Sequence, residues 1–414
     1  MPVLAALALG LPLSAPAPAQ EGPNPGLTVS LSQGLGFDTN ADLDPGVEDS
    51  RTSALTALGL SYASSTPASR LTLQAGANVE VPFSDDEARV DGPSLSFGYE
   101  RAVPASSFTA SGRFSRTDVS FLRGLGDFLG EDGTIDLPDD FEDLEGEGTR
   151  QLGRLDASLS LRDDAPFGAT LSAGVQGVDY SDVSAESELL DYTDTNFGAE
   201  LRFSLTETID LRAGFTTSTY EEDGSDPETE RGVDFQGSIA RPDGQYVARL
   251  GFDDTDEGLR TSLSFGRDLE RPLGAVSGRI GVTRDGTGDL QLTGGVSASR
   301  TLPRGTASLA LDQSVETLEG DEEELVTTLA ARLNQEMTPT TSLSLDALYG
   351  ASQDTSTDAR TRSLELGATV QRQLTRAWNL SLGYRHERED ETGEELAKND
   401  NLFLTLGRQF GGGL

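Results

Sequence analysis

Oxygen-bearing side chains recur at every second residue in one short acidic segment. Asp38, Asn40, Asp42 and Asp44 have this spacing, which is that of the oxygen ligands in calcium loops. The match is partial, because the sixth position of such a loop is normally glycine and is Leu43 here. Two interpretations stay open: a calcium site formed by Asp38, Asn40, Asp42 and Asp44, or an acidic rim where a strand leaves an apolar environment and enters water.

The residues needed for most enzymatic chemistry are scarce. The chain has no cysteine and one histidine, His386, which excludes thiol catalysis and zinc–thiolate sites. Asn379 and Ser381 precede His386 in the same segment but form no recognisable catalytic motif with it. We therefore expect no enzymatic activity and, apart from calcium, no cofactor.

The charge balance excludes another class of partner. Acidic residues number 70 and basic residues 31, which gives a formal net charge of −39. Nucleic-acid binding needs a basic surface, so we expect no nucleic-acid partner. Every basic residue except Lys398 is an arginine, a side chain that stays charged and holds carboxylates with two parallel hydrogen bonds.

The N-terminal residues have the features of an export signal. The segment MPVLAALALGLPLSAPAPA contains an apolar stretch followed by Ala17-Pro18-Ala19, and an apolar stretch before an A-x-A site is typical of secretory signal peptides. The basic residues that usually precede the stretch are missing, since the first is Arg51. We expect residues 1–19 to be a cleaved signal peptide and residues 20–26 a short lead-in.

Most of the remaining chain alternates apolar and polar residues. Segments such as RLDASLSLR (154–162) and NFGAELRFSL (196–205) place an apolar residue at nearly every second position, which is the period of a β-strand with one wet face. Nine short connectors, such as RPDG (241–244), alternate with ten loops, most of them longer and acidic. The pattern predicts about twenty antiparallel strands, in a range of about 18–22, of roughly ten residues each.

The two kinds of connector favour a barrel in a membrane. Short turns at one rim and long loops at the other are typical of transmembrane barrels, whose strands cross in ~9–11 residues. In lipid every backbone polar group needs a partner, so the sheet must close. We predict an all-β fold: a closed antiparallel up-and-down transmembrane β-barrel over residues 27–410, with short periplasmic turns, long acidic external loops and a tail at 411–414. A solenoid or propeller is disfavoured because the turns lack a fixed period; a soluble secreted all-β protein is the competing class.

The C-terminal segment carries a resemblance. NLFLTLGRQFGGGL (401–414) alternates Leu402, Leu404 and Leu406 and then reaches Phe410. It resembles the last-strand signal of bacterial outer-membrane β-barrel proteins, which ends on an aromatic residue, whereas here four residues follow Phe410. The layout of residues 27–410 resembles porin-like barrels, including barrels associated with exopolysaccharide export.

The resemblance implies a place in the bacterial outer membrane, contact with its lipid and lipopolysaccharide, and insertion by the barrel-assembly machinery. It also implies a pore for passive passage of hydrophilic or anionic solutes or of a secreted polysaccharide. Because the first strand begins near Leu27 with no plug domain ahead of it, we expect passive passage rather than energy-coupled uptake. The alternative is a structural or surface-interaction barrel with an occluded lumen, whose acidic loops contact envelope partners. The oligomeric state is left open.

If the apolar rows of the strands face lipid, their alternate residues face the lumen. This set holds more arginines than carboxylates, which predicts a mildly basic wall in which arginine lies beside aspartate or glutamate on neighbouring strands. Such a wall either steers anionic or polyhydroxylated solutes or is a structural charge ladder. The predicted lining residues are Arg113, Arg154, Arg162, Arg202, Arg212, Arg249, Arg260, Arg279, Arg332, Arg385, Glu80, Asp156, Glu200, Asp210, Asp234, Asp346 and Glu365.

The longest connector, residues 118–150, is the third external loop. It has eleven acidic residues and two arginines, yet also an apolar cluster that includes Leu122, Phe128 and Phe141. Loops of this length in a compact domain are usually functional or disordered, and the apolar cluster argues against full disorder. In general porins the third external loop folds inward and narrows the pore. By that analogy the loop folds into the lumen here, and an outward lid is the alternative.

Overall fold

The structure is a computed structural model that describes residues 26–413 apart from 42, 44, 47–49, 85–87, 120–121, 123–124, 131–132, 136, 139, 142–147, 163, 184–188, 319–321, 356–358 and 394. The predicted signal peptide (1–19) and residues 20–25 of the predicted lead-in lie outside the described residues.

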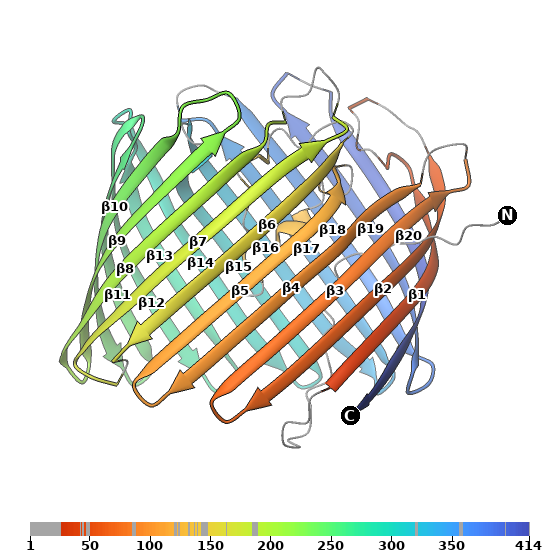
Figure 1. The fold of residues 1–414 in the computed structure, drawn as a ribbon, viewed down its shortest axis with the longest axis horizontal. Coiled ribbons are helices and arrows are strands. Elements are labelled where there is room, and N and C mark those ends of the chain that lie inside the picture. Colours follow the sequence, from red (N-terminus) through yellow and green to blue (C-terminus); the bar gives the residue numbers. More distant parts are fainter. Residues whose placement is uncertain are drawn as a thin grey trace.

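Twenty strands form one antiparallel sheet in which each strand pairs with the next along the chain. The strands, tilted as Figure 1 shows, are β1 (Gly26–Asp38), β2 (Arg51–Thr66), β3 (Ser69–Pro82), β4 (Arg89–Val103), β5 (Ser106–Asp118), β6 (Thr149–Leu161), β7 (Phe167–Ser181), β8 (Tyr192–Thr206), β9 (Ile209–Glu222), β10 (Glu228–Arg241), β11 (Gly244–Thr255), β12 (Gly258–Arg271), β13 (Gly274–Arg284), β14 (Leu290–Leu302), β15 (Gly305–Leu318), β16 (Glu322–Thr338), β17 (Thr341–Gln353), β18 (Arg360–Gln373), β19 (Trp378–Glu391) and β20 (Ala397–Gly413).

The sheet closes on itself because β1 also pairs with β20. The pairing is continuous from Gly26 opposite Gly413 to Asp38 opposite Asn401, so neither edge is left without a partner. The prediction of an all-β, closed, antiparallel, up-and-down barrel of about twenty strands is thereby confirmed. Residues 411–413, predicted to be part of a tail, belong to β20 instead.

The strands contain 11 to 17 residues, which is longer than the predicted length of roughly ten. The estimate counted only the apolar part that crosses a bilayer, and the strands continue past that part. The first residues of β16, for example, are Glu322, Glu323 and Glu324.

Most connectors are longer at one end of the barrel than at the other, as predicted, although only two residues join β11 to β12 at the long-loop end. Turns such as Arg241–Gly244 and Arg271–Gly274 leave only two residues between strands at one end. Gly244 has a φ of +135°, and a Cβ atom there would lie 2.0 Å from the carbonyl oxygen of Asp268, so the turn requires glycine. The connector between β5 and β6, residues 119–148 (the long loop from here on), is at the other end.

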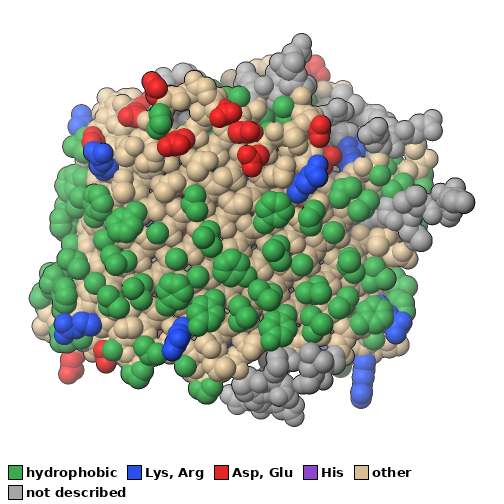
Figure 2. Space-filling model, viewed as in Figure 1, with side chains coloured by type: hydrophobic (Ala, Val, Ile, Leu, Met, Phe, Trp, Pro, Cys, Tyr) green, Lys and Arg blue, Asp and Glu red, His purple; other side chains and the backbone are tan. Residues whose placement is uncertain are grey.

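The outer face of the sheet is apolar and exposed. Leu155, Leu201 and Phe235 are 49%, 42% and 48% exposed, and each has a polar neighbour on either side in its strand. Figure 2 shows hydrophobic side chains spread across the visible face among backbone and other side chains, with acidic side chains mostly gathered toward the end that carries the longer loops. A soluble protein rarely exposes an apolar surface of this extent, which argues against the soluble secreted class.

Helical structure is minor. Within the long loop, η2 (Leu125–Phe128) is a single 3-10 turn. No helix in the described part of the chain has the length and apolarity needed to span a bilayer.

Candidate functional site: the barrel lumen

The predicted lining residues occupy one face of the sheet. Each of them except Arg162 alternates with an exposed apolar residue of its own strand, for example Arg212 with Leu211 and Glu365 with Leu366. Since successive side chains of a strand point to opposite faces, these residues project to the inner side. Whether they act as the lining of a pore stays a prediction.

Arg162, unlike the other predicted lining residues, does not lie on the inner face. Strand β6 ends at Leu161, and Arg162 begins the turn with a φ of +59°, so the alternation no longer fixes its direction. Its guanidinium lies 6.0 Å from the ring centroid of Phe167, an exposed residue that packs against Phe203. Arg162 therefore lies at the outer side of the turn rather than on the inner wall.

The long loop folds into the lumen. Its residues Leu125, Ile135, Leu137 and Phe141 form a buried cluster with the inner-face residues Val326, Ala330 and Leu348 of β16 and β17. Gly350 makes room for the loop, because a Cβ atom at that position would lie 3.0 Å from Cδ2 of Leu125. The sequence left open whether the long loop folds into the lumen or forms an outward lid, and in the structure it folds into the lumen.

Hydrogen bonds attach the loop to the same wall. The backbone N–H of Gly126 donates to Oε2 of Glu365 at 3.0 Å, and Glu365 is almost completely buried. Arg385 Nε lies 3.2 Å from Glu365 Oε1, and its Nη1 lies 3.4 Å from Glu387 Oε1. We call Val326, Ala330, Leu348 and Glu365 the covered wall.

A buried ion pair fastens the C-terminal part of the loop to the barrel. Arg150 Nε and Nη2 donate to Asp140 Oδ2 and Oδ1 at 2.8 and 3.0 Å, and Arg150 Nη2 donates to the Tyr192 hydroxyl at 3.1 Å. The Tyr180 hydroxyl also donates to Asp140. Since both charged side chains are less than 10% exposed, their partners must be kept for the pair to persist.

Other inner-face ion pairs are open to solvent. Arg154 Nε lies 3.0 Å from Asp156 Oδ2, Arg212 Nη1 lies 3.4 Å from Glu200 Oε1, and Arg279 Nη2 lies 2.6 Å from Asp312 Oδ1. These six side chains, which we call the open wall, are 35–46% exposed. Although they point inward, water reaches them.

Arg260 gathers three carboxylates near the loop end of β12. It contacts Glu230, Asp253 at 3.7 Å and Glu323 at 3.5 Å, and it donates to Thr317 Oγ1 at 3.0 Å. Its side chain is only 11% exposed. We interpret this arginine as structural, because ion pairs with neighbouring carboxylates neutralise its charge.

Arginine lies beside a carboxylate of the neighbouring strand at Arg212 and Arg385, as predicted, but two pairs of arginines also face each other. Arg113 stands directly opposite Arg154, and Arg202 directly opposite Arg212. Like charges in this position repel. Arg202 is held by the carbonyl oxygens of Arg162 and Ala165, at 3.3 and 3.1 Å.

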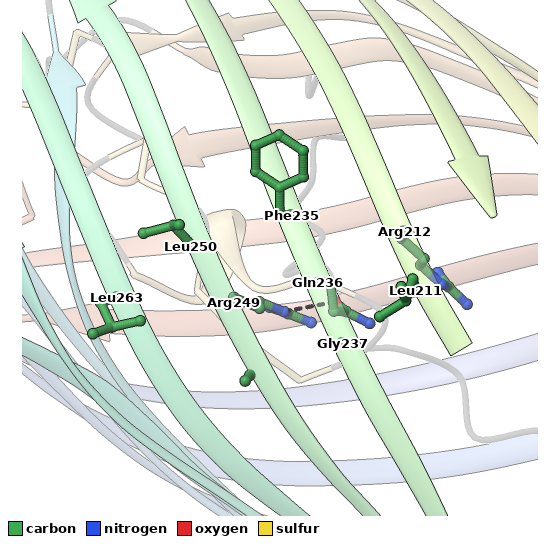
Figure 3. A pocket seen from close by; sticks show the side chains of 9 residues that line it. Leu211, Arg212, Phe235, Gln236, Gly237, Arg249, Leu250 and Leu263 are labelled. Atoms are coloured by element: carbon green, nitrogen blue, oxygen red, sulfur yellow. Dashed lines mark hydrogen bonds between the residues drawn. The ribbon is translucent and has the colours of Figure 1, made fainter. Parts of the chain in front are cut away.

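Of the predicted lining arginines, Arg113, Arg249 and Arg332 make no ion pair within 4.0 Å in the described part of the chain, and of these three only Arg332 stands directly opposite a carboxylate, Asp346. Arg249 Nε donates to Gln236 Oε1 at 2.8 Å, and Figure 3 shows it directed toward Gln236 on the neighbouring strand. Because neither Arg113 nor Arg249 stands opposite a carboxylate, their positive charge is the part of the wall most available to an anion.

The wall as a whole is not basic. Carboxylates absent from the predicted set share the inner face, among them Glu230, Asp253, Asp268, Asp312 and Glu387. Continuing the alternation of each strand to its end would have found them, for example Asp312 in the alternating segment SLALDQSV (308–315).

Of the predicted calcium ligands, two lie outside the described residues, Asp42 and Asp44. Asp38 Oδ1 accepts hydrogen bonds from the side-chain amides of Asn399 and Asn401, at 3.3 and 2.7 Å, and the backbone N–H of Asn40 donates to Asn399 Oδ1 at 3.1 Å. The described residues contain no cluster of three or more candidate metal ligands. The calcium site stays a prediction.

The possible catalytic residues of β19 do not come together. His386 Nδ1 lies 2.9 Å from Asp400 Oδ1, which also accepts from the Tyr384 hydroxyl at 2.5 Å. Tyr384 is on the exposed outer face, and so is His386 two residues later. Asn379 and Ser381 occupy the alternate positions of β19 and face the lumen.

No protein-family model and no curated protein sequence matches the chain. Among solved structures, a mutant of the ferric enterobactin receptor PfeA from Pseudomonas aeruginosa is 10% identical, with a TM-score of 0.50 over 95% of this chain and 81% of the receptor. The siderophore receptor PirA from Acinetobacter baumannii is 8% identical, with the same TM-score and coverages. OccAB4 from Acinetobacter baumannii is 10% identical over 94% of this chain and 98% of its own, at a TM-score of 0.38. In its fold, a closed antiparallel β-barrel, the chain is similar to these two receptors.

Proposed function

We propose that the protein is a pore of the bacterial outer membrane through which hydrophilic solutes pass passively along the open wall. The observation that carries this proposal is the exposure of the inward-facing ion pairs of β6, β8, β9, β13 and β15, at 35–46%. Charged side chains keep such exposure inside a barrel only where the lumen holds water. A barrel of about twenty strands has an interior that wall side chains alone cannot fill.

The long loop narrows this passage from one side. It is packed on the covered wall through an apolar cluster and through Glu365, whereas the open wall lies on other strands. The arrangement supports a passage bounded by the loop on one side and by charged side chains on the other. Membrane lipid, lipopolysaccharide and the barrel-assembly machinery are partners that belong to the same proposal.

The test is the conductance of the full-length protein in planar lipid bilayers. Steady open channels are expected, because the open wall is hydrated. A complete absence of channels would favour the alternative, a structural barrel with an occluded lumen whose acidic loops contact envelope partners. This alternative is supported by the inward fold of the long loop, because the loop occupies part of the lumen.

Preference for anions is a finer part of the proposal. It rests on Arg113 and Arg249, which make no ion pair in the described part of the chain, whereas the three arginines of the open wall already pair with carboxylates. Replacing both with glutamine should shift the reversal potential in a salt gradient toward cation selectivity. Arg162→Gln is the matched control, since Arg162 lies outside the lumen. Unchanged selectivity in the double variant would remove the steering role and leave a neutral hydrophilic pore.

A further inference from the structure

A cavity of about 720 Å³ lies between the long loop and the inner face of β11–β15. Gly133 and Thr134 of the loop line one side, and the turn residues Arg241, Pro242 and Gly244 mark its end of the barrel. Because the short turns form the periplasmic rim of the proposed pore, the cavity lies at the periplasmic end of the passage.

The wall of this cavity carries two rows of polar side chains that run across neighbouring strands, with the inner-face alanines Ala240, Ala275 and Ala310 among them. In the first row the sheet register places Gln245 opposite Asp268, Asp268 opposite Ser277, and Ser277 opposite Ser297. Gln245 Nε2 donates to Asp268 Oδ2 at 2.7 Å, and the Ser277 and Ser297 hydroxyls lie 2.7 Å apart.

The second row lies one step closer to the turns. Ser299 stands opposite Ser308, and Glu270 lies two strands away, with Ala275 between Glu270 and Ser299. Neighbouring strands are ~4.8 Å apart, so the two rows present a regular grid of hydroxyl, amide and carboxylate groups. Arg241 is the one basic side chain among the residues that line the cavity.

The chemistry of this grid fits an uncharged polyhydroxylated solute. Serine hydroxyls both donate and accept hydrogen bonds, and carboxylates accept from hydroxyl donors. Sugar hydroxyls offer both roles at close intervals. An anion would be repelled by Asp268 and Glu270, and the short side chains leave room for a ring to lie against the sheet.

We propose that the cavity is a saccharide-binding subsite formed by Gln245, Asp268, Ser277, Ser297, Ser299 and Ser308. The subsite deepens the proposed pore function and rests on it, since it names the class of solute that pauses at the periplasmic end of the passage. A small cation held by Asp268 and Glu270 is the competing occupant.

Titration calorimetry on the full-length protein in detergent tests the subsite without requiring conduction, with maltotriose as a neutral trisaccharide probe. Binding is expected in the natural protein, and Ser297→Phe should weaken it at least tenfold because the ring fills the cavity. Ser158→Phe introduces the same ring on the inner face of β6, outside the cavity, and should leave the affinity unchanged. Absence of binding in the natural protein, or equal affinity in Ser297→Phe, would overturn the subsite.

The Asp268→Asn variant separates the two occupants. It removes a charge but keeps a hydrogen-bonding side chain, so maltotriose affinity should change less than threefold, whereas binding of a cation such as spermidine should be lost. Spermidine binding that disappears in this variant, together with no maltotriose binding, would assign the cavity to a cation.

Bilayer recordings distinguish the failure of the two proposals. In open channels, maltotriose should interrupt the current in the natural protein and in Ser158→Phe but not in Ser297→Phe. Calorimetric binding without any channels would refute the pore and support the subsite. Open channels without binding or current interruptions would support the pore and refute the subsite.

Discussion

The ion pairs Arg150–Asp140 and Arg279–Asp312 are both close contacts with opposite surroundings. In the first, Nε and Nη2 of Arg150 each donate to one carboxylate oxygen, at 2.8 and 3.0 Å, and in the second Nη2 of Arg279 lies 2.6 Å from both oxygens. The first pair is less than 10% exposed and connects the long loop to the barrel, whereas the second is 35–40% exposed on the open wall. The same chemistry thus fastens one part of the lumen and leaves another hydrated, and burial makes the difference.

The largest effect is expected when the buried pair is broken. Arg150→Gln leaves the Asp140 carboxylate buried without its cation, which destabilises the docked loop by about 3–5 kcal/mol. Hydrogen exchange of peptides that contain Leu125–Phe128 should accelerate strongly, and channel conductance should rise as the loop leaves the lumen. Exchange that matches the natural protein would mean that the pair does not hold the loop.

Truncation of the covered wall should have the next largest effect. Leu348 is 1% exposed in the cluster beneath the loop, and Leu348→Ala removes buried methyl groups at a cost of about 2–5 kcal/mol. The same hydrogen-exchange measurement should report a less protected loop. Leu345→Ala, on the lipid-facing side of the same strand and 39% exposed, is the matched control and should leave loop exchange unchanged; equal effects would show that the loop does not depend on this contact.

The connector between β13 and β14 offers a smaller, pH-dependent effect. Burial alone would raise the pKa of Asp285, but hydrogen bonds from Thr287, Gln291 and the backbone N–H groups of Asp289 and Gly288 lower it below its usual value. Because the folded pKa is depressed, the stabilisation is present above the ordinary carboxyl pKa and is lost as pH falls through the lower folded value.

Exchange of amides 286–289 should therefore stay slow on acidification past the ordinary carboxyl pKa and accelerate only at lower pH. The Asp285→Asn variant removes the titrating group and should abolish this transition. A transition that persists in the variant would assign it to another carboxyl group.

The smallest effect is expected for the exposed pair. Arg279→Gln leaves Asp312 in contact with water, so the loss of stability should be about 0–1 kcal/mol. Urea unfolding followed by the fluorescence of Trp378, the single tryptophan, provides the measurement. A loss as large as that of Arg150→Gln would contradict the distinction between the open wall and the fastened loop.

The sequence was sufficient to predict the barrel itself. Alternation of apolar and polar residues has the period of the strand, so the number of strands, the order of short turns and loops, and the inner-face position of the predicted lining residues followed from it. Arg162 was the exception because the alternation was extended one residue past the end of β6.

Features that depend on register or on tertiary contacts could not be predicted in this way. Arg113 meets Arg154 because of how far β5 is shifted against β6, which the alternation within each strand does not specify. The long loop points inward because Leu125 packs in the space next to Gly350. Gly350 lies more than 220 positions after Leu125 in the sequence. The inward-facing apolar residues Val326 and Leu348, on strands whose inner face is otherwise mostly polar, were the available signal.

The pairing of β1 with β20 has a consequence for biogenesis. Asp38 accepts a hydrogen bond from Asn399, 361 positions away in the sequence, so this seam cannot form until the final segment has been synthesised and delivered. Before then the incomplete sheet has two edge strands with unpaired backbone groups, which can pair with other chains. Loss of the final strand should therefore yield an aggregation-prone sheet rather than a smaller barrel.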